Sequence, residues 1–384
     1  MFNPADSLNA AVIAVIVVFT AAIVMLIGLV ALKAVHRRRA RTRRERHVRY
    51  VALLSRHLSS DLPLDPIAAS AVDDDAFLDA VIDIRNIVAG RDVDTLAGVV
   101  DRVGLARRQV KKLRSRFPLG RRLRAAVALA ELGDESTARV LLHHLEDREP
   151  EIRLQCARGL GRMRYEPAIN VILDRFGGEA PWVRARFADT LVAFGPRATW
   201  PLVSYIRAGL RDRSNESVVE AIRVLGVIGD PEAGLTLADL LLVSVDPEVQ
   251  IAAIESLATV GGPLAIRPLK QSLRSPDWRL RAKAATSLGK IGDPSVNMAL
   301  ANLLRDSNWW VRRNSAAALA SIHDGVDVLF EAISSDDRFA RDAAAEALAD
   351  CGALAAARDR SDSGLADDRD MALLALVGGE RALT

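Results

Sequence analysis

The sequence contains few cysteines and few aromatic residues, and each scarcity excludes a class of protein. Only two cysteines, Cys156 and Cys351, occur in 384 residues, so they imply no disulfide framework. A low cysteine count also fits a reducing compartment. Aromatic residues make up 4% of the chain although 50% of it is hydrophobic. Alanine and leucine must therefore fill the core, which is typical of closely stacked helices.

The sequence also lacks the short motifs that mark common catalytic and metal sites. It has no Gly-rich phosphate-binding loop, no HExxH, no paired CxxC and no GxSxG. His143 and His144 are the only adjacent histidines, and no second cluster completes a metal site. We therefore expect no catalytic residues, no cofactor, no metal and no small-molecule substrate, and we expect that the protein is not an enzyme.

A repeated pattern with a period near 31 residues organises most of the chain. Leu288 and Leu319 are 31 residues apart, as are Arg281 and Arg312. Each unit holds two short apolar segments at helical spacing, separated by a turn such as the Gly-Asp-Pro of residues 292–294, which ends one helix and begins the next. Leucines equivalent to Leu288, the marker leucines, stand at Leu129, Leu160, Leu191, Leu225, Leu257, Leu319 and Leu348. This self-similarity predicts an array of stacked helix pairs.

The motif VRxxAAxALGxIGDP, clearest from Leu280 to Pro294, resembles the HEAT repeat in the short form of phycobilisome-lyase-like bacterial proteins. The resemblance covers roughly residues 119–357. It implies an all-α fold, an armadillo-like α-solenoid of about eight helix pairs, which serves as an extended scaffold. The deoxyhypusine hydroxylases, a HEAT-type enzyme family, hold iron with His-Glu pairs, but this sequence contains no His-Glu dipeptide.

The repeats and their flanks divide the chain into six predicted segments. A cap is expected before the repeats because the end of a solenoid must be covered. The apolar stretch from Met371 either caps the last repeat or docks on a partner. The predicted segments are a short extracytoplasmic tail (1–9), a transmembrane helix (10–32), a basic juxtamembrane segment (33–49), a helical N-terminal cap region (50–118), the HEAT-repeat solenoid (119–357) and a polar C-terminal tail with a short apolar segment (358–384).

The expected transmembrane helix rests on 23 consecutive residues without a charge, at positions 10–32. A span needs about 20 apolar residues. A dense basic run follows it and none precedes it, so the positive-inside rule places the N-terminus outside and the repeats in the cytoplasm. The basic run either contacts anionic lipid or forms a nucleic-acid patch, and a neighbouring span favours lipid. The residues expected at the membrane surface are Lys33, Arg37, Arg38, Arg39, Arg41, Arg43 and Arg44.

The resemblance also implies roles for residues on the second helix of each unit. In HEAT proteins that helix faces inward, and its exposed positions are candidates for binding, although a merely soluble face is the alternative. Tryptophans near its start are either interface residues or packed on the next repeat. A repeated arginine is expected to form a ladder with aspartates in neighbouring turns, here Asp147, Asp277, Asp306 and Asp337. The predicted protein-binding residues are Arg158, Arg162, Arg186, Arg223, Lys283, Lys290, Asn314, Trp182 and Trp310.

Together these features predict a single-pass protein of the bacterial inner membrane, with a cytoplasmic repeat domain that acts as a non-catalytic scaffold or adaptor. Its expected partners are proteins, with anionic lipid at the basic segment, and a membrane-bound glycosyltransferase assembly for envelope polysaccharide is one that fits. Two alternatives stay open. One is a lyase-type enzyme subunit of the phycobilisome-lyase-like class. The other is a nucleic-acid-binding HEAT-like protein, which the acidic last repeat and the expected membrane anchor disfavour.

Overall fold

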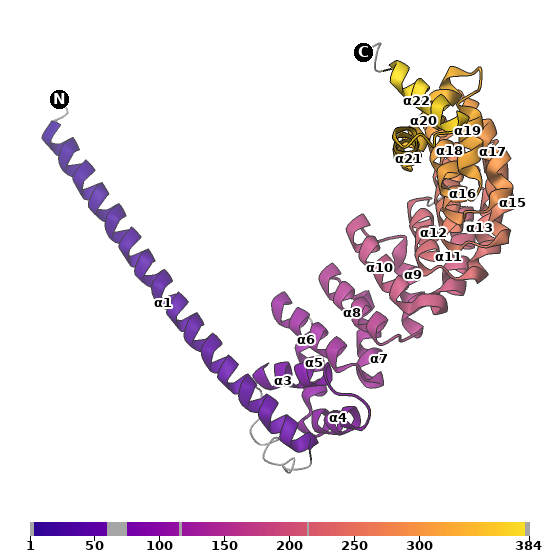
Figure 1. The fold of residues 1–384 in the computed structure, drawn as a ribbon. Helices are drawn as coiled ribbons and strands as arrows, with labels where there is room; N and C mark the ends of the chain where they lie inside the picture. Colours follow the sequence, from indigo (N-terminus) through magenta and orange to yellow (C-terminus); the bar gives the residue numbers. More distant parts are fainter. Residues whose placement is uncertain (1–3, 60–74, 115–116, 213–214, 381–384) are drawn as a thin grey trace. The chain divides into compact units, whose positions relative to one another are not determined.

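The computed structural model describes residues 4–59, 75–114, 117–212 and 215–380 (Figure 1). All regular secondary structure in these ranges is helical, which confirms the predicted all-α class. The chain divides into two compact units, Met1–Val140 and Leu141–Thr384, and each is described by itself.

The first unit is built on one long helix. Tyr50 and Leu54, near the end of that helix, are buried against Phe77, whose ring centroid lies 5.3 Å from that of Tyr50. The same core continues into Ala128 and Leu132 of the first predicted repeat. The helices of this unit are α1 (Pro4–Leu58), α3 (Asp75–Arg85), α4 (Arg91–Val103), α5 (Leu105–Leu113) and α6 (Leu119–Leu132), and α7 (Glu135–His143) crosses the boundary between the units.

The structure contradicts the predicted transmembrane helix. No helix in the described part of the chain is long and apolar enough to cross a membrane. This finding overturns the predicted single-pass topology and the predicted inner-membrane location. The side chains of residues 10–18, 21 and 22, which belong to the predicted span, lie outside the described residues.

The basic residues after this run belong to the same continuous helix, α1, and several are engaged within the protein. Arg43 donates to Asp79 of α3 at 2.6 Å, and Arg41 pairs with Glu45 at 3.0 Å. The side chain of Arg39 lies outside the described residues. The remaining predicted membrane-surface residues are exposed on α1 and are Lys33, Arg37, Arg38 and Arg44.

The second unit consists of two layers of helices. The second helices of successive repeats contact one another in chain order and form what we call the B layer, and the first helices form the A layer beside it (Figure 1). The B layer comprises α8 (Pro150–Arg162), α10 (Pro181–Phe194), α12 (Asn215–Ile228), α14 (Pro247–Val260), α16 (Trp278–Ile291), α18 (Trp309–Ser321) and α20 (Arg338–Asp350). The A layer comprises α9 (Pro167–Phe176), α11 (Thr199–Asp212), α13 (Gly234–Val243), α15 (Pro263–Ser272), α17 (Asn297–Asn302) and α19 (Gly325–Ala332), with short helices η1 (His144–Glu146), η2 (Gly195–Ala198), η3 (Pro231–Ala233), η4 (Pro294–Val296) and η5 (Leu303–Arg305) in the connections.

Two helices complete the second unit, α21 (Ala353–Asp362) and α22 (Asp368–Glu380). Arg360 of α21 donates to Asp370 of α22 at 2.7 Å, and Leu373 is fully buried. The apolar segment from Met371 therefore packs on the end of the array, which is the first of the two alternatives for it.

Small residues allow the B helices to approach closely. A Cβ atom built on Gly289 of α16 would lie 2.8 Å from the Cα atom of Ala318 in α18. Between α12 and α14, the hydroxyl of Ser256 donates to the carbonyl oxygen of Ile222 at 2.9 Å. Such contacts explain why a core with few aromatic residues suffices, because backbones that nearly touch leave little volume to fill. The marker leucines fill what remains, and all of them in the second unit are fully buried.

Replacing Leu288 by alanine should lower the free energy of unfolding by about 2–5 kcal/mol, because a fully buried leucine leaves a cavity. The loss should stay local, since each repeat contacts only its neighbours. Urea denaturation measures the size of the loss, and amide hydrogen exchange measures its extent. Val227→Ala, at an exposed position on α12, is the control and should change little. A neutral Leu288→Ala would contradict the repeat assignment.

Replacing Gly289 by alanine should cost about 1–3 kcal/mol, because the new methyl group meets the backbone of Ala318, which has no side-chain freedom to yield. Gly98→Ala in α4 is the matched control. A Cβ atom there meets nothing within 4 Å, so it should stabilise that helix by about 0.5–1 kcal/mol. Thermal unfolding of both variants gives the comparison, and equal shifts of the same sign would show that close helix contact is not the constraint.

Candidate protein-binding surface

The predicted contact residues lie on the B helices, and most of them are exposed. Ion pairs neutralise three of the basic side chains: Arg186 lies 3.5 Å from Asp189, Arg223 lies 3.7 Å from Glu220, and Lys283 pairs with Glu255 of α14. The B layer is therefore less basic than the sequence suggests. The predicted positions are Arg158 and Arg162 on α8, Trp182 and Arg186 on α10, Arg223 on α12, Lys283 and Lys290 on α16, and Trp310 and the half-buried Asn314 on α18.

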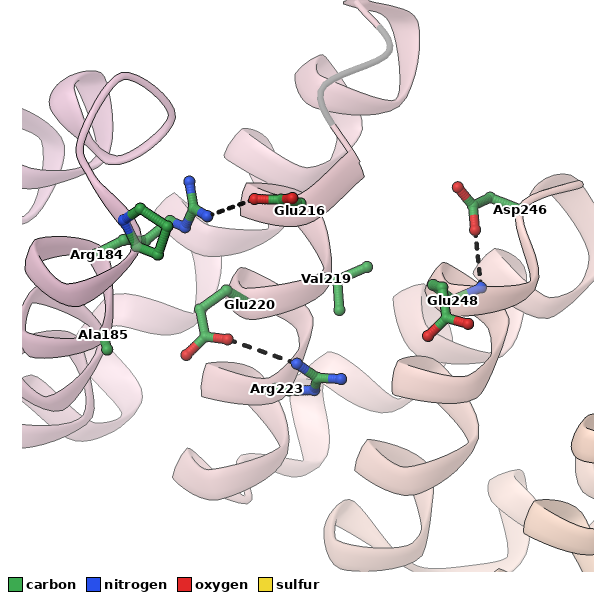
Figure 2. Close-up of a pocket in the computed structure, with 9 residues that line it drawn as sticks. Arg184, Ala185, Glu216, Val219, Glu220, Arg223, Asp246 and Glu248 are labelled. Carbon is green, nitrogen blue, oxygen red and sulfur yellow. Dashed lines mark hydrogen bonds and ion pairs between the residues drawn. The ribbon is translucent and has the colours of Figure 1, made fainter.

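A hollow of about 390 Å³ opens among the first turns of α10, α12 and α14 (Figure 2). Arg184 of α10 closes one side by donating to Glu216 of α12 at 2.8 Å. Of the predicted contact residues, only Arg223 reaches it. Four carboxylates and two guanidinium groups make its lining acidic on balance. The lining residues are Pro181, Arg184, Ala185, Glu216, Val219, Glu220, Arg223, Asp246 and Glu248.

The charged groups of this hollow are occupied by structural contacts. Asp246 caps α14 by accepting a hydrogen bond from the backbone amide of Glu248 at 2.8 Å, and Glu248 receives Arg279 of α16 at 3.0 Å. Among the described residues, no group of three or more His, Cys, Asp or Glu side chains is arranged to hold a metal ion. The arrangement therefore joins neighbouring repeats, and the absence of a cofactor stays a prediction.

Exposed aromatic side chains stand in the first turns of four B helices, α10, α16, α18 and α20, and we call this set the aromatic edge. Trp182 and Trp310 are 52% and 50% exposed, so about half of each ring is open to a partner. Trp309 packs against Trp310 with ring centroids 4.6 Å apart, and the guanidinium carbon of Arg313 lies 5.3 Å from the Trp309 ring. The full set is Trp182, Trp278, Trp309, Trp310 and Phe339.

The sequence analysis missed Phe339. It occupies the same place in α20 that Trp310 occupies in α18, two residues after the residue that caps the helix. This position, two residues after the capping residue, is the sequence signal from which Phe339 could have been predicted. The guanidinium carbon of Arg312 lies 4.6 Å from the Phe339 ring centroid, so this aromatic residue also joins adjacent repeats.

The predicted ladder of arginine and aspartate is seen between Arg281 and Asp306. Arg281 of α16 donates two hydrogen bonds, of 2.7 and 2.8 Å, to the carboxylate of Asp306, which lies in the turn before α18. Arg312 donates instead to the backbone oxygen of Asp306 at 2.8 Å, and Arg153 pairs with the buried Glu179. Asp277 and Asp337 cap helices, and the backbone oxygen of Asp147 accepts a hydrogen bond from Arg153.

The Arg281–Asp306 pair affects the titration of its carboxyl group. Burial alone would raise the pKa of Asp306, but hydrogen bonds from Arg281 and from the backbone amide of Asn308 outweigh burial and hold the pKa below its ordinary value of 3.8. The ionised form is therefore the one that stabilises the fold. Its contribution is fully present above the ordinary pKa and is lost as the pH falls through the lowered value.

Asp306→Asn should therefore destabilise the protein by about 1–3 kcal/mol at neutral pH, because the amide keeps the shape but loses the charge that Arg281 binds. The difference from the unmodified protein should shrink as the pH falls below about 4. Asp189→Asn is the control, since its pair with Arg186 is exposed and is worth less than about 1 kcal/mol. Denaturant unfolding across the pH range measures both, and a constant difference at every pH would contradict the assignment.

Comparisons with known proteins agree with this geometry. A family model described as HEAT repeats matches residues 110–192, 169–258, 203–279, 266–349 and 296–374. No curated protein matches the sequence. Solved structures that are similar include Kap121p bound to Nup53p, with 13% identity and a TM-score of 0.50 over 78% of this chain and 39% of that chain. Human deoxyhypusine hydroxylase in complex with glycerol is 20% identical, with a TM-score of 0.28 over 65% of this chain and 96% of that chain. An engineered protein is 22% identical, with a TM-score of 0.33 over 78% and 92%.

Proposed function

This chain belongs to the HEAT-repeat family, and from that premise we propose that it is a non-catalytic scaffold that binds other proteins along the aromatic edge. The observation that carries the proposal is the row of partly exposed tryptophans beside a fully packed core. Tryptophan and arginine are the residues most enriched among those that dominate binding energy at protein interfaces. Kap121p, which has a similar fold, binds another protein, Nup53p, and this likeness concerns the fold alone.

The rings of the aromatic edge are held in place before a partner binds, so they lose little conformational freedom on binding. Trp309 and Trp310 restrain each other by edge-to-face contact, and both follow the helix cap formed by Asn308, which accepts a hydrogen bond from the Trp310 backbone amide at 2.9 Å. The helix beneath is fixed by its neighbours on both sides. A partner that covers these rings therefore gains apolar contact without first ordering them.

Part of the sequence-based hypothesis does not enter this proposal. The predicted membrane tether is contradicted. Lipid contact by the basic segment and a glycosyltransferase assembly were predicted together with that tether, and they form no part of the proposal. The nucleic-acid alternative needs a basic face that is free to bind phosphates. The ion pairs of Arg186, Arg223 and Lys283 reduce that charge. The lyase alternative predicts that the purified protein carries a bilin, visible as absorbance.

The test is recovery of partner proteins by chemical cross-linking and mass spectrometry with the full chain. Trp182→Ala and Trp310→Ala should each reduce recovery about tenfold or more, since hot-spot residues contribute about 2 kcal/mol or more. Trp200→Ala is the matched control, because Trp200 is equally exposed but lies on α11 of the A layer. Melting temperatures should stay unchanged for all three variants.

Three outcomes would contradict the proposal. If no protein is recovered reproducibly, or if visible bilin absorbance accompanies the protein, the scaffold function is wrong. If Trp200→Ala lowers recovery as much as Trp310→Ala does, the binding surface is not the aromatic edge.

A further inference from the structure

A second hollow, of about 470 Å³, lies between α15 and α17 in the A layer and differs from the first in its charge. Three cationic side chains and no carboxylate line it. Arg267, Lys270 and Arg274 are spaced by three and four residues, which places them on one face of α15 and of the turn that follows. The other lining residues are Gln271, Leu273, Ala299, Asn302 and Leu303.

The cations of this hollow are less neutralised by acidic side chains than most basic residues of the B layer. Within the described ranges, no acidic side chain pairs with Arg267 or Arg274, and both are exposed. Lys270 donates to the backbone oxygen of Ser295 at 3.4 Å. The carboxylate of Asp293, which caps the turn by accepting from the Ser295 amide, lies near enough to compensate part of the Lys270 charge, so Arg267 and Arg274 are the less compensated cations. The basic residues of the aromatic edge and the B layer, by contrast, are mostly paired.

The neighbouring helix continues the surface with apolar side chains. Leu235 and Leu242 of α13 occupy the positions that Arg267 and Arg274 occupy in the next repeat, and they are 64% and 69% exposed. Leu242 and Gln271 together line a smaller hollow of about 140 Å³. Gln271 also lines the basic hollow, so the apolar and basic parts form one continuous surface across α13 and α15.

We call the surface formed by Leu235, Leu242, Arg267, Lys270 and Arg274 the A-layer groove. We infer that it is a second docking surface, and that its occupant is a protein segment with leucine-like side chains followed by carboxylates. The inference rests on the proposed function in that the occupant is a protein. The apolar part of the segment covers Leu235 and Leu242, and its carboxylates enter the hollow of Arg267, Lys270 and Arg274. Arginine binds carboxylates with paired hydrogen bonds, which gives such a contact direction as well as charge complementarity.

The extent of the groove favours a peptide over a nucleic acid or a lipid surface. Nucleic-acid affinity depends on contacts to many phosphates. Here the three cations that line the hollow all come from α15 and the turn that follows it, and two repeats further on α19 carries the acidic Asp327. A lipid surface is flat, whereas these cations line a hollow that admits individual side chains.

The experiment is a fluorescence anisotropy titration of the full chain with a labelled peptide whose first half is rich in leucine and whose second half is rich in glutamate. We expect the double variant Arg267→Glu/Arg274→Glu to bind about tenfold or more weakly. Leu235→Ser/Leu242→Ser should also weaken binding. Arg158→Glu/Lys290→Glu reverses two exposed cations of the B layer and is the matched control, which should bind as the unmodified chain does. Added salt should weaken binding to the unmodified chain.

Several results would overturn the inference. The inference is wrong if the unmodified chain does not bind the peptide, or if it binds a peptide with lysine in place of glutamate equally well. It is also wrong if the two A-layer double variants bind as the unmodified chain does, or if Arg158→Glu/Lys290→Glu weakens binding as much as they do. Stronger binding of phosphatidylglycerol vesicles or of a single-stranded oligonucleotide, lost in Arg267→Glu/Arg274→Glu, would replace the peptide by that ligand. If the unmodified chain does not bind the peptide but recovers cross-linked partners that are lost in Trp310→Ala, this inference fails while the proposed function stands.

Discussion

The close approach of neighbouring B helices is the constraint on which the second unit depends. Where α16 crosses α18, Gly289 faces the backbone of Ala318 with no room for a methyl group, and Gly226 faces the backbone of Ser256 in the same way between α12 and α14. Serine hydroxyls at other crossings donate to backbone carbonyls of the preceding repeat, as Ser287 does to Ile254 at 3.2 Å. Because the crossings admit only small residues, large side chains must lie elsewhere. Most tryptophans of this unit accordingly stand at the helix starts, beyond the crossings.

The close approach of the B helices also determines which charged side chains are exposed on each layer. A B helix held on both sides keeps one narrow exposed stripe, and charges on that stripe sit close to those of the next repeat. Lys283 and Glu255 meet for this reason, one repeat apart. On the A layer, the residue one repeat before Arg267 at the equivalent position is the exposed, uncharged Leu235. This arginine therefore has an apolar rather than an acidic counterpart, and a docking surface for a charged segment fits there.

The repeat fold could be predicted from the sequence because the signals for it, the period and the marker leucines, recur in each repeat and depend on contacts close in the chain. Leu288 and its equivalents pack inside their own repeat, so their burial does not depend on how successive repeats are arranged. The charges depended on distances between repeats, which a single sequence does not reveal: Asp306 met Arg281 as expected, but Arg153 found Glu179 instead. The span over residues 10–32 was predicted from composition alone, and the structure contradicts it. The basic hollow escaped notice because the prediction considered only the second helix of each unit.

Two docking surfaces on one array give a scaffold a property that neither has alone. A segment on the A-layer groove and a protein on the aromatic edge contact different helices of the same repeats, since α15 packs on α16 and α16 carries Trp278 at its start. A partner that engages both gains effective concentration at the second site without any new contact. The Arg281–Asp306 pair fixes α16 to the turn before α18, so the spacing between the two surfaces is set by the same ion pair that holds neighbouring repeats together.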